Sequence, residues 1–560
     1  MGKKFAALIA CMFAAVLFAL PATARAATPT EILVGGQDIL ATSDYTIVCG
    51  QGQATYDKAT NTLTLENVKI NYQQDETDNT KGAIRFDGDL NIELVGKNSI
   101  TSATCGIMSA GAGSLTITGE ADDSLTVDAV YFGIGSADGA RNVTISGAYV
   151  DVDVDLRSPF IGTGIQAGGQ LSIVDGATVD VSGSTSETLP VVGNGGVSIV
   201  GSNVSARVLA DGAYGSGVIV SDGDVVIDGS KVEVSTTATY NFGIRAGNDL
   251  TPSEGTIHIK NNSRVNATSG DGMALFTMLG DIQIEDSNVT ATSSGHDAVY
   301  AIGDILIAGA ANVTASGPYP ALVATGSIVL DPQGAHIDVW SGDAEGDADK
   351  IVGSPFTEKV TLGTSSGNYF HCAPHAHEFT EQIADDAHLA SGATCTEAAS
   401  YYLSCSCGEM GTDTFSSGDS LGHDWGEPAW SWSDDHTELV ATFTCANDPT
   451  HTEVLTAKPT ASVQAEPSCT EPGTMLYSAT VELGGERYEA TATAEIPATG
   501  HDFVDGTCVT CGAEDPDYVE PEKGAAAIPA TGDANTLFSA APALAGATAV
   551  AAGTLLRRRR

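Results

Sequence analysis

The sequence predicts an all-β fold in which a long parallel β-helix is followed by small cysteine-rich β modules. Three observations support this prediction. The region from about 82 to 345 is rich in Gly, Val, Ile, Thr, Ser and Asp, similar units recur along it, and most cysteines and histidines gather after residue 365. Short alternating segments stacked coil upon coil would bury one face of every strand.

The units that recur share one pattern. Each begins with an apolar pair and passes through a Gly or Asp turn into an alternating segment, as in GIMSAGAGSLTITG from Gly106 and GIQAGGQLSIVDG from Gly164. A second alternating segment follows, as in SLTVDA, ATVDVSG and SNVTATS. Units recur about every 22 to 30 residues, which is typical of solenoids. We expect about ten right-handed coils within residues 27–360. A propeller or sandwich is disfavoured because antiparallel strands need regular tight hairpins.

The start of this region is expected to cap the first coil, since an uncovered coil leaves strand edges free to aggregate. It reads ILVGGQDIL from Ile32 and then ATYDKATNTLTLENVKI up to Ile70. The stretch from Tyr56 to Leu65 resembles the opening of a family of carbohydrate-binding bacterial surface β-helices, related in shape to pectate lyases. The resemblance implies that this β-helix binds polysaccharide or host glycan.

An acidic row is the main candidate ligand face of the β-helix. Asp151, Asp153 and Asp155 alternate with valines, so they should line one outer face about 6 to 7 Å apart. Asp180, in the next coil, is expected to stack near this row. Such carboxylates could bind Ca²⁺ or a cationic ligand. The acids at Gly-Asp turns are better explained as caps of their own backbone.

No catalytic residue can be assigned from the sequence. The few lysines and arginines of the β-helix form no recognisable catalytic pattern, and a glycosidase would need two carboxylates at a set separation. Glycan binding, which the resemblance implies, is the leading function. A β-helix polysaccharide lyase or glycoside hydrolase is the first alternative, and a passive stalk or adhesin with a protein partner is the second.

The charge of the chain excludes one class of partner. The 560 residues carry 24 Lys and Arg against 71 Asp and Glu, a net charge of −47. Nucleic acid binding needs a cation for each phosphate contact, and this chain offers few. The acidity is compatible with binding cations such as Ca²⁺ or basic partners, and with a role in solubility alone.

Two cysteine-rich modules are expected, over residues 365–420 and 421–512. The spacing of Cys372 with His375 and His377, of Cys405 with Cys407, and of Cys508 with Cys511 suits a structural Zn²⁺ site. Disulfides are nevertheless the leading expectation for an exported protein, with the Zn²⁺ site as the alternative and free thiols as a third. Disulfides or Zn²⁺ would both staple modules with thin cores. Both modules resemble wall-proximal modules of Gram-positive surface proteins, and residues 513–527 form an acidic linker to the wall.

The two ends of the chain indicate export. Residues 1–26 have a basic start at Lys3 and Lys4, an apolar run, and the cleavage pattern Ala24-Arg25-Ala26, as in a secretory signal peptide. Near the other end, LFSAAPALAGATAVAAGTLL is long enough to cross a bilayer as a transmembrane helix. Four terminal arginines follow it, the flank that keeps such a tail inside.

The pentapeptide IPATG precedes this apolar segment and consists of Ile528, Pro529, Ala530, Thr531 and Gly532. The order of pentapeptide, apolar segment and basic tail over residues 528–560 resembles the sorting signal of sortase-anchored Gram-positive surface proteins. The resemblance implies that a sortase cleaves between Thr531 and Gly532 and joins Thr531 to peptidoglycan at the cell surface. The family usually has Leu where Ile528 stands, which leaves the sortase class open; a plain single-pass anchor is the alternative.

The same pentapeptide also occurs at 496–500. There the polar stretch HDFVDGTCVTCG follows instead of an apolar segment. We expect this first copy to belong to a folded module and to escape the sortase.

Overall fold

The computed structural model describes residues 27–73, 80–111, 113–135, 142–155, 162–185, 187–208, 217–239, 241–248 and 254–520. The expected signal peptide, the sorting signal and residues 521–527 of the expected linker lie outside these ranges. Within them the chain forms strands and two 3₁₀ turns, η1 (Ile39–Ala41) and η2 (Glu345–Asp347). None of the segments in these ranges is a helix long and apolar enough to cross a membrane.

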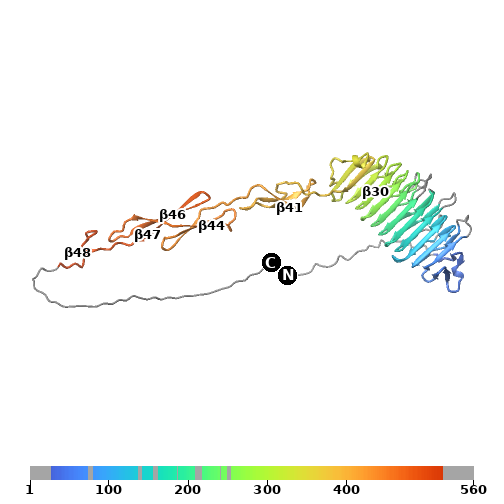
Figure 1. Cartoon of the computed structure of the whole chain (residues 1–560), viewed down its shortest axis with the longest axis horizontal. Helices are drawn as coiled ribbons and strands as arrows, with labels where there is room; N and C mark the ends of the chain where they lie inside the picture. Colours follow the sequence, from blue (N-terminus) through green and yellow to red (C-terminus); the bar gives the residue numbers. More distant parts are fainter. Residues whose placement is uncertain are drawn as a thin grey trace. The chain divides into compact units, whose positions relative to one another are not determined.

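A parallel β-solenoid of about 9 turns forms the first part of the chain. One of its faces, here called the polar sheet, stacks one strand from each turn (Figure 1). Its parallel strands are β6 (Lys69–Tyr72), β9 (Lys97–Ser102), β12 (Ser124–Ala129), β15 (Tyr149–Val154), β18 (Thr178–Gly183), β21 (Asn203–Val208), β24 (Lys231–Thr236), β27 (Arg264–Ser269), β30 (Asn288–Ser293) and β33 (Asn312–Ser316).

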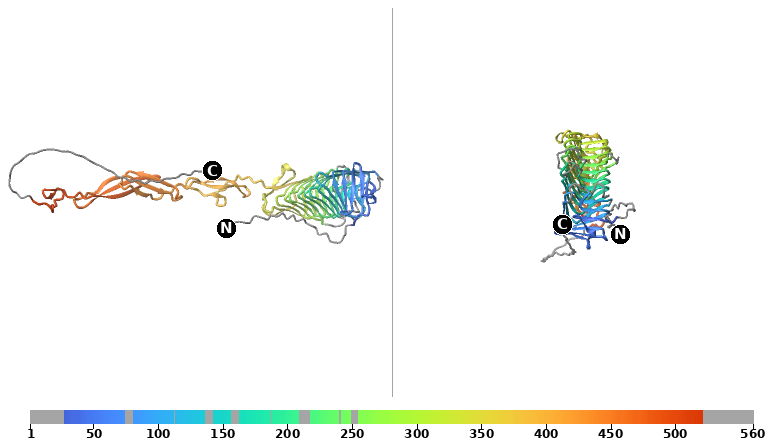
Figure 2. Two further views of the ribbon diagram at one scale, coloured as in Figure 1. Left: turned by 90° about the horizontal axis from the view of Figure 1, so that it is seen from below. Right: turned by 90° about the vertical axis from the view of Figure 1, so that its right-hand side faces the viewer.

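Two further stacks complete each turn, and Figure 2 shows the coils from two more directions. One stack runs through β7 (Gly82–Phe86), β10 (Cys105–Ser109), β13 (Phe132–Gly135), β16 (Gly162–Ala167), β19 (Thr188–Gly193), β22 (Ile219–Ser221), β25 (Ile244–Ala246), β28 (Leu275–Thr277) and β31 (Val299–Ala301). The other runs through β5 (Thr62–Glu66), β8 (Leu90–Val95), β11 (Leu115–Thr118), β14 (Val143–Ser146), β17 (Gln170–Val174), β20 (Gly196–Val200), β23 (Val225–Asp228), β26 (Ile257–Lys260), β29 (Ile282–Glu285) and β32 (Ile305–Ala308). Both stacks end on β34 (Leu322–Asp331).

The core of the solenoid consists of in-register ladders of apolar side chains. Isoleucines stack on one another in successive turns, as Ile173, Ile199 and Ile227 do, and all three are fully buried. Period-two alternation places every second residue inward, and burying such a side chain contributes about 1.5–3 kcal/mol. The parallel pairing confirms the predicted parallel β-helix and rules out the antiparallel propeller and sandwich for this region.

Antiparallel strands cover both ends of the solenoid. At the first end, β1 (Ile32–Val34) pairs with β2 (Gln37–Asp38) and β7, and β3 (Thr46–Cys49), β4 (Gly52–Asp57) and β5 form a meander. At the other end, β37 (Val360–Ser365) pairs with β34, and β38 (Tyr369–Pro374) lies between β33 and β35 (Ile337–Gly342). The outer edge of β35 pairs with β36 (Asp349–Lys350). The expected first cap is therefore present. The solenoid also continues through β37 and β38, past the module boundary expected at residue 365.

By compactness the chain divides into residues 1–383 with 402–413, and residues 384–401 with 414–560. Beyond the solenoid it forms small antiparallel sheets. Their strands are β39 (Leu389–Ser391), β40 (Ala399–Ser404) and β41 (Met410–Ser417); β42 (Ala429–Trp432), β43 (Leu439–Thr444) and β44 (Thr452–Ala457); β45 (Thr460–Ala465), β46 (Gly473–Leu483) and β47 (Glu486–Ile496); and β48 (Phe503–Val504) with β49 (Thr507–Cys508). Few of their apolar side chains are buried, as expected for modules that need staples.

Candidate metal centres and ligand-binding face

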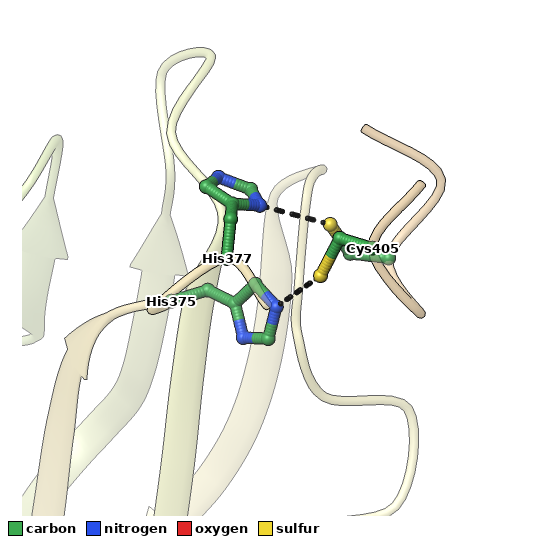
Figure 3. Close-up of side chains that lie close together, drawn as sticks. His375, His377 and Cys405 are labelled. Carbon is green, nitrogen blue, oxygen red and sulfur yellow. Dashed lines mark hydrogen bonds between the residues drawn. The ribbon is translucent and has the colours of Figure 1, made fainter. Parts of the chain in front are cut away.

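The first candidate centre consists of His375, His377, Cys405 and Cys407. The histidines follow β38 and the cysteines follow β40, so two short segments face each other (Figure 3). Nε2 of His375 lies 3.1 Å from Sγ of Cys405, and Nδ1 of His377 lies 3.2 Å from Sγ of Cys407. The four ligand atoms all lie within 4.8 Å of one another.

Asp338 orients one of these histidines. Its carboxylate lies 2.6 Å from Nδ1 of His375 and accepts a hydrogen bond there, which leaves Nε2 turned toward Cys405. The pKa of His375 is raised above its usual value, first by Asp338 and then by Cys405. A carboxylate behind a histidine is the usual support of a metal-binding imidazole. The sequence pointed to His375 but not to Asp338, which comes from β35.

Cys372 does not join the first centre. Strand alternation in β38 points Phe370 and Cys372 into the solenoid core, whereas His375 and His377 come after the strand ends. Cys372 is fully buried, and this burial raises the pKa of its thiol to about 12. The structure thus separates Cys372 from the two histidines with which its spacing grouped it, and it acts as an apolar core residue.

The last candidate centre consists of Cys469, His501, Cys508 and Cys511. Sγ of Cys469 lies 3.7 Å from Sγ of Cys508, and Sγ of Cys511 lies 3.3 Å from Nδ1 of His501. The sequence paired Cys508 with Cys511 by spacing. It did not identify Cys469 or His501 as ligands, although Gly-His-Asp before an aromatic residue occurs twice within the second expected module, at Gly422 and Gly500, and could have been a signal.

A middle group consists of Cys395, His423 and Cys445. The Sγ atoms of its two cysteines lie 3.6 Å apart, and both residues are buried. No spacing rule singled out these residues, because they lie in three separate stretches of sequence. Cys395 falls in the first expected module, whereas His423 and Cys445 fall in the second.

The sulfur separations suit a shared metal ion. The cysteines of the three groups are thiols rather than disulfides. Sulfur pairs at 3.6 and 3.7 Å are much farther apart than the roughly 2.05 Å of a disulfide bond. Two thiolates on one tetrahedral Zn²⁺, each about 2.3 Å from the ion, would lie roughly 3.8 Å apart. The first and last groups therefore supply four sulfur and nitrogen donors each, and the middle group supplies three.

One cysteine in each group is held as a thiolate, the form that binds metal. The backbone amide of Cys407 and then both histidines lower the pKa of Cys405 to about 5. At Cys445 burial opposes ionisation, but the amide of Asp448 and His423 bring the pKa to about 6. For Cys508 the amide of Cys511 and then His501 lower the pKa to about 5.

The acidic row on the polar sheet has the geometry that the sequence predicted. Asp151 and Asp153 point outward from β15, and Asp180 lies directly opposite Asp151 on β18. Neighbouring hydroxyl groups donate hydrogen bonds to these carboxylates: Tyr149 to Asp180 at 2.9 Å, Ser182 to Asp153 at 2.8 Å and Ser184 to Asp155 at 2.9 Å. Burial and then Asp180 raise the pKa of Asp151. These bonds account for the row without a cation, and Ca²⁺ binding stays a prediction.

A hollow on the polar sheet begins at β24, the second strand after the β18 strand of the acidic row. It has a volume of about 340 Å³ and is lined by Lys231, Val232, Glu233, Arg264, Val265, Asn266, Asn288 and Thr290. Lys231 and Arg264 are register partners on adjacent strands, and Lys231 pairs with Glu233 at 2.7 Å. The sequence did not reveal this site. Its residues come from successive strands that are offset by 24 to 33 positions along the chain, and they meet only because the coils are in register.

No family model, curated protein or solved structure matches this chain.

Proposed function

We propose that this chain is a cell-surface protein whose solenoid binds polysaccharide or host glycan. The observation that carries the proposal is the hollow on the polar sheet. Its walls offer a guanidinium, an ammonium, amides and a hydroxyl within one shallow site. Guanidinium and amide groups bind sugar hydroxyls and carboxylates through paired hydrogen bonds.

The charge of the hollow favours a ligand with acceptor oxygens. In a chain of net charge −47, Lys231 and Arg264 stand opposite each other on β24 and β27. Glu233 already pairs with Lys231 at 2.7 Å, and the guanidinium of Arg264 on the next strand can donate hydrogen bonds to oxygen atoms of a ligand. Asn266 and Asn288 lie beside this pair and add amide groups to the same site.

The open shape of the polar sheet also favours an extended ligand. Outward side chains repeat at the strand spacing of about 4.8 Å along the solenoid, as Asn266, Thr290 and Thr314 do on successive strands. A long polymer could contact several turns at once. The proposal places the protein at the cell wall, with Thr531 as the anchored residue after sortase cleavage, on the strength of the sequence order over residues 528–560.

The test is a glycan array probed with the full-length chain, with and without Ca²⁺. Arg264→Ala should weaken binding about 10–100-fold, because a hydrogen bond to a charged group contributes roughly 1.5–3 kcal/mol. Lys97→Ala is the matched control, since Lys97 is the outward residue of the same position on β9 and lies outside the hollow. Loss of binding in chelator would support a Ca²⁺ role for Asp151, Asp153 and Asp180.

Three outcomes would contradict this proposal. If Arg264→Ala and Lys97→Ala bind alike, the hollow is not the glycan site. If bound glycans are converted to unsaturated or reducing products, the chain is a polysaccharide-degrading enzyme. If no glycan binds or is cleaved, a stalk or adhesin with a protein partner is the better account.

A further inference from the structure

The middle and last groups share a backbone scaffold as well as donor atoms. In the middle group, the amide of Leu421 donates to Thr394 at 2.8 Å, and in the last group the amide of Thr499 donates to Ser468 at 3.0 Å. Each acceptor directly precedes the first cysteine, Cys395 or Cys469. Each donor lies two positions before the histidine. The same bond thus brings the first cysteine and the histidine together in both groups.

A second shared bond places the next cysteine. The amide of Ala446, directly after Cys445, donates to the carbonyl of Asp424 at 2.7 Å, and the amide of Val509, directly after Cys508, donates to that of Asp502 at 2.9 Å. Each acceptor directly follows the group's histidine. Both first cysteines also begin the tripeptide Cys-Thr-Glu. The two groups are therefore built as copies of one structural unit.

The histidines show that the first centre belongs to the same series. Each stacks on an aromatic ring two positions later: His377 on Phe379 with 5.7 Å between centroids, His423 on Trp425 with 4.7 Å, and His501 on Phe503 with 5.1 Å. The interplanar angles are 14°, 15° and 19°. In the first centre His375 stands in place of the Cys-Thr-Glu cysteine.

The cysteine that follows begins a short turn in all three groups. The amide of Cys405 donates to Glu409 at 2.8 Å, that of Cys445 to His451 at 3.0 Å, and that of Cys508 to Ala513 at 2.8 Å. In the first and last groups this turn carries one more ligand, Cys407 or Cys511. The turn of the middle group carries His451.

His451 is placed to be the missing donor of the middle group. Its ring centroid lies 5.1 Å from that of His423. Its Nδ1 atom is buried and has no hydrogen-bond partner in the described part of the chain. Its Nε2 atom lies 3.8 Å from the carboxylate of Asp448, the arrangement of an outer carboxylate behind a metal-binding imidazole. A buried nitrogen without a partner costs free energy unless something binds it.

We propose that His451 is the fourth ligand of the middle group and that all three groups are tandem copies of one Zn²⁺-binding unit. Two donor sets are His375, His377, Cys405 and Cys407, and Cys469, His501, Cys508 and Cys511. The middle set consists of Cys395, His423 and Cys445, to which the proposal adds His451. Four donors close a tetrahedral site and leave no position for substrate, so the ions are structural. Zn²⁺ binding then supplies folding free energy that the thin cores lack.

The inference is independent of glycan binding and is tested by metal content. The full-length chain, produced in a reducing cytoplasm and equilibrated with Zn²⁺, should retain three ions per molecule by elemental mass spectrometry. His451→Ala should weaken the middle site more than about 100-fold, beyond the loss of an outer-sphere partner, and leave two tightly held ions. His436→Ala is the matched control, because His436 belongs to the same module and stacks on Tyr477 outside the group.

A second variant provides a test that does not depend on correct folding of His451→Ala. His451→Cys recreates the donor found at Cys511 and should restore three ions, with the stronger sulfur-to-metal charge-transfer absorption of a third thiolate when Co²⁺ replaces Zn²⁺. The proposal is overturned if the wild-type chain binds fewer than three ions or if His451→Ala retains all three. It is also overturned if mass spectrometry of exported protein shows Cys395–Cys445 and Cys469–Cys508 joined as disulfides.

Discussion

His375 illustrates how single residues acquire their roles here. Asp338 takes one ring nitrogen and Cys405 faces the other, so the ring is oriented before any ion binds. Asp338 itself is held by Lys350 at 2.5 Å, and these partners keep the pKa of its carboxyl below the usual value even though burial alone would raise it. Cys372 lies in the apolar core, whereas His375, which follows it closely in the chain, is a candidate metal ligand.

The contrast between Cys372 and Cys405 can be measured. Cys372→Ala should leave the Zn²⁺ content unchanged and lower the free energy of unfolding by about 1 kcal/mol, because it removes one buried atom from the core. Cys405→Ala should lose one ion, because it removes a donor of the first centre. Elemental analysis and urea unfolding of both variants provide the measurement. Loss of an ion in Cys372→Ala would place Cys372 among the ligands.

At the scale of the elements, the solenoid depends on close approach between its faces. Gly106, Gly133 and Gly164 stack at equivalent positions of β10, β13 and β16. A Cβ on Gly133 would lie 2.1 Å from Cγ1 of Val152 and 2.5 Å from the carbonyl oxygen of Gly164. The repeated Gly-Ile pair therefore meets a packing requirement of the solenoid. The glycine leaves room for a valine side chain of the polar sheet, and the isoleucine side chain packs in the core.

Gly133→Ala tests this requirement. The added methyl group must displace Val152 or the adjoining backbone, so the free energy of unfolding should fall by about 1–3 kcal/mol. The measurement is urea unfolding followed by circular dichroism. Gly346→Ala is the control, because Gly346 lies in η2, where an added methyl group would meet no atom within 4 Å. Equal stability of the two variants would show that the solenoid can relax around a side chain.

At the scale of the whole molecule, the two IPATG copies lie in different settings. Ile496 ends β47, and Thr499 donates its amide to Ser468 within the scaffold of the last group. The first copy therefore belongs to a folded module, whose backbone holds Thr499. The second copy lies in residues 528–560, for which the sequence predicts the sorting signal.

We therefore expect opposite effects from matched threonine variants. Thr531→Ala should release the protein from the cell wall into the membrane fraction or the medium, because it removes the residue proposed to form the bond to peptidoglycan. Thr499→Ala should remain anchored. Fractionation of producing cells, followed by immunoblotting of wall, membrane and medium, measures the difference. Retention of Thr531→Ala in the wall would contradict sortase anchoring at this site.

The sequence by itself determined the all-β architecture, the parallel stacking and the first cap. These features depend on residues that are near one another in the chain. Alternating apolar residues favour strands, and similar units at a regular spacing favour stacked coils. The same alternation placed Asp151 and Asp153 on an outer face, and the position of Asp180 in the next coil followed from the repeat. Cysteine and histidine spacing also indicated several residues of the candidate metal centres, namely His375, His377, Cys405, Cys407, Cys508 and Cys511.

Only the tertiary structure decided which distant residues meet. Cys469 lies beside Cys508, Cys395 lies beside Cys445, and Lys231 is the register partner of Arg264. The two members of each pair are far apart in the chain, and no local sequence pattern predicts that they meet. It also assigned Cys372 to the core, since β38 extends the solenoid beyond the expected boundary. The physical reason is that local periodicity is set by a residue's chain neighbours, whereas a binding site depends on how strands and turns of different lengths bring remote side chains together.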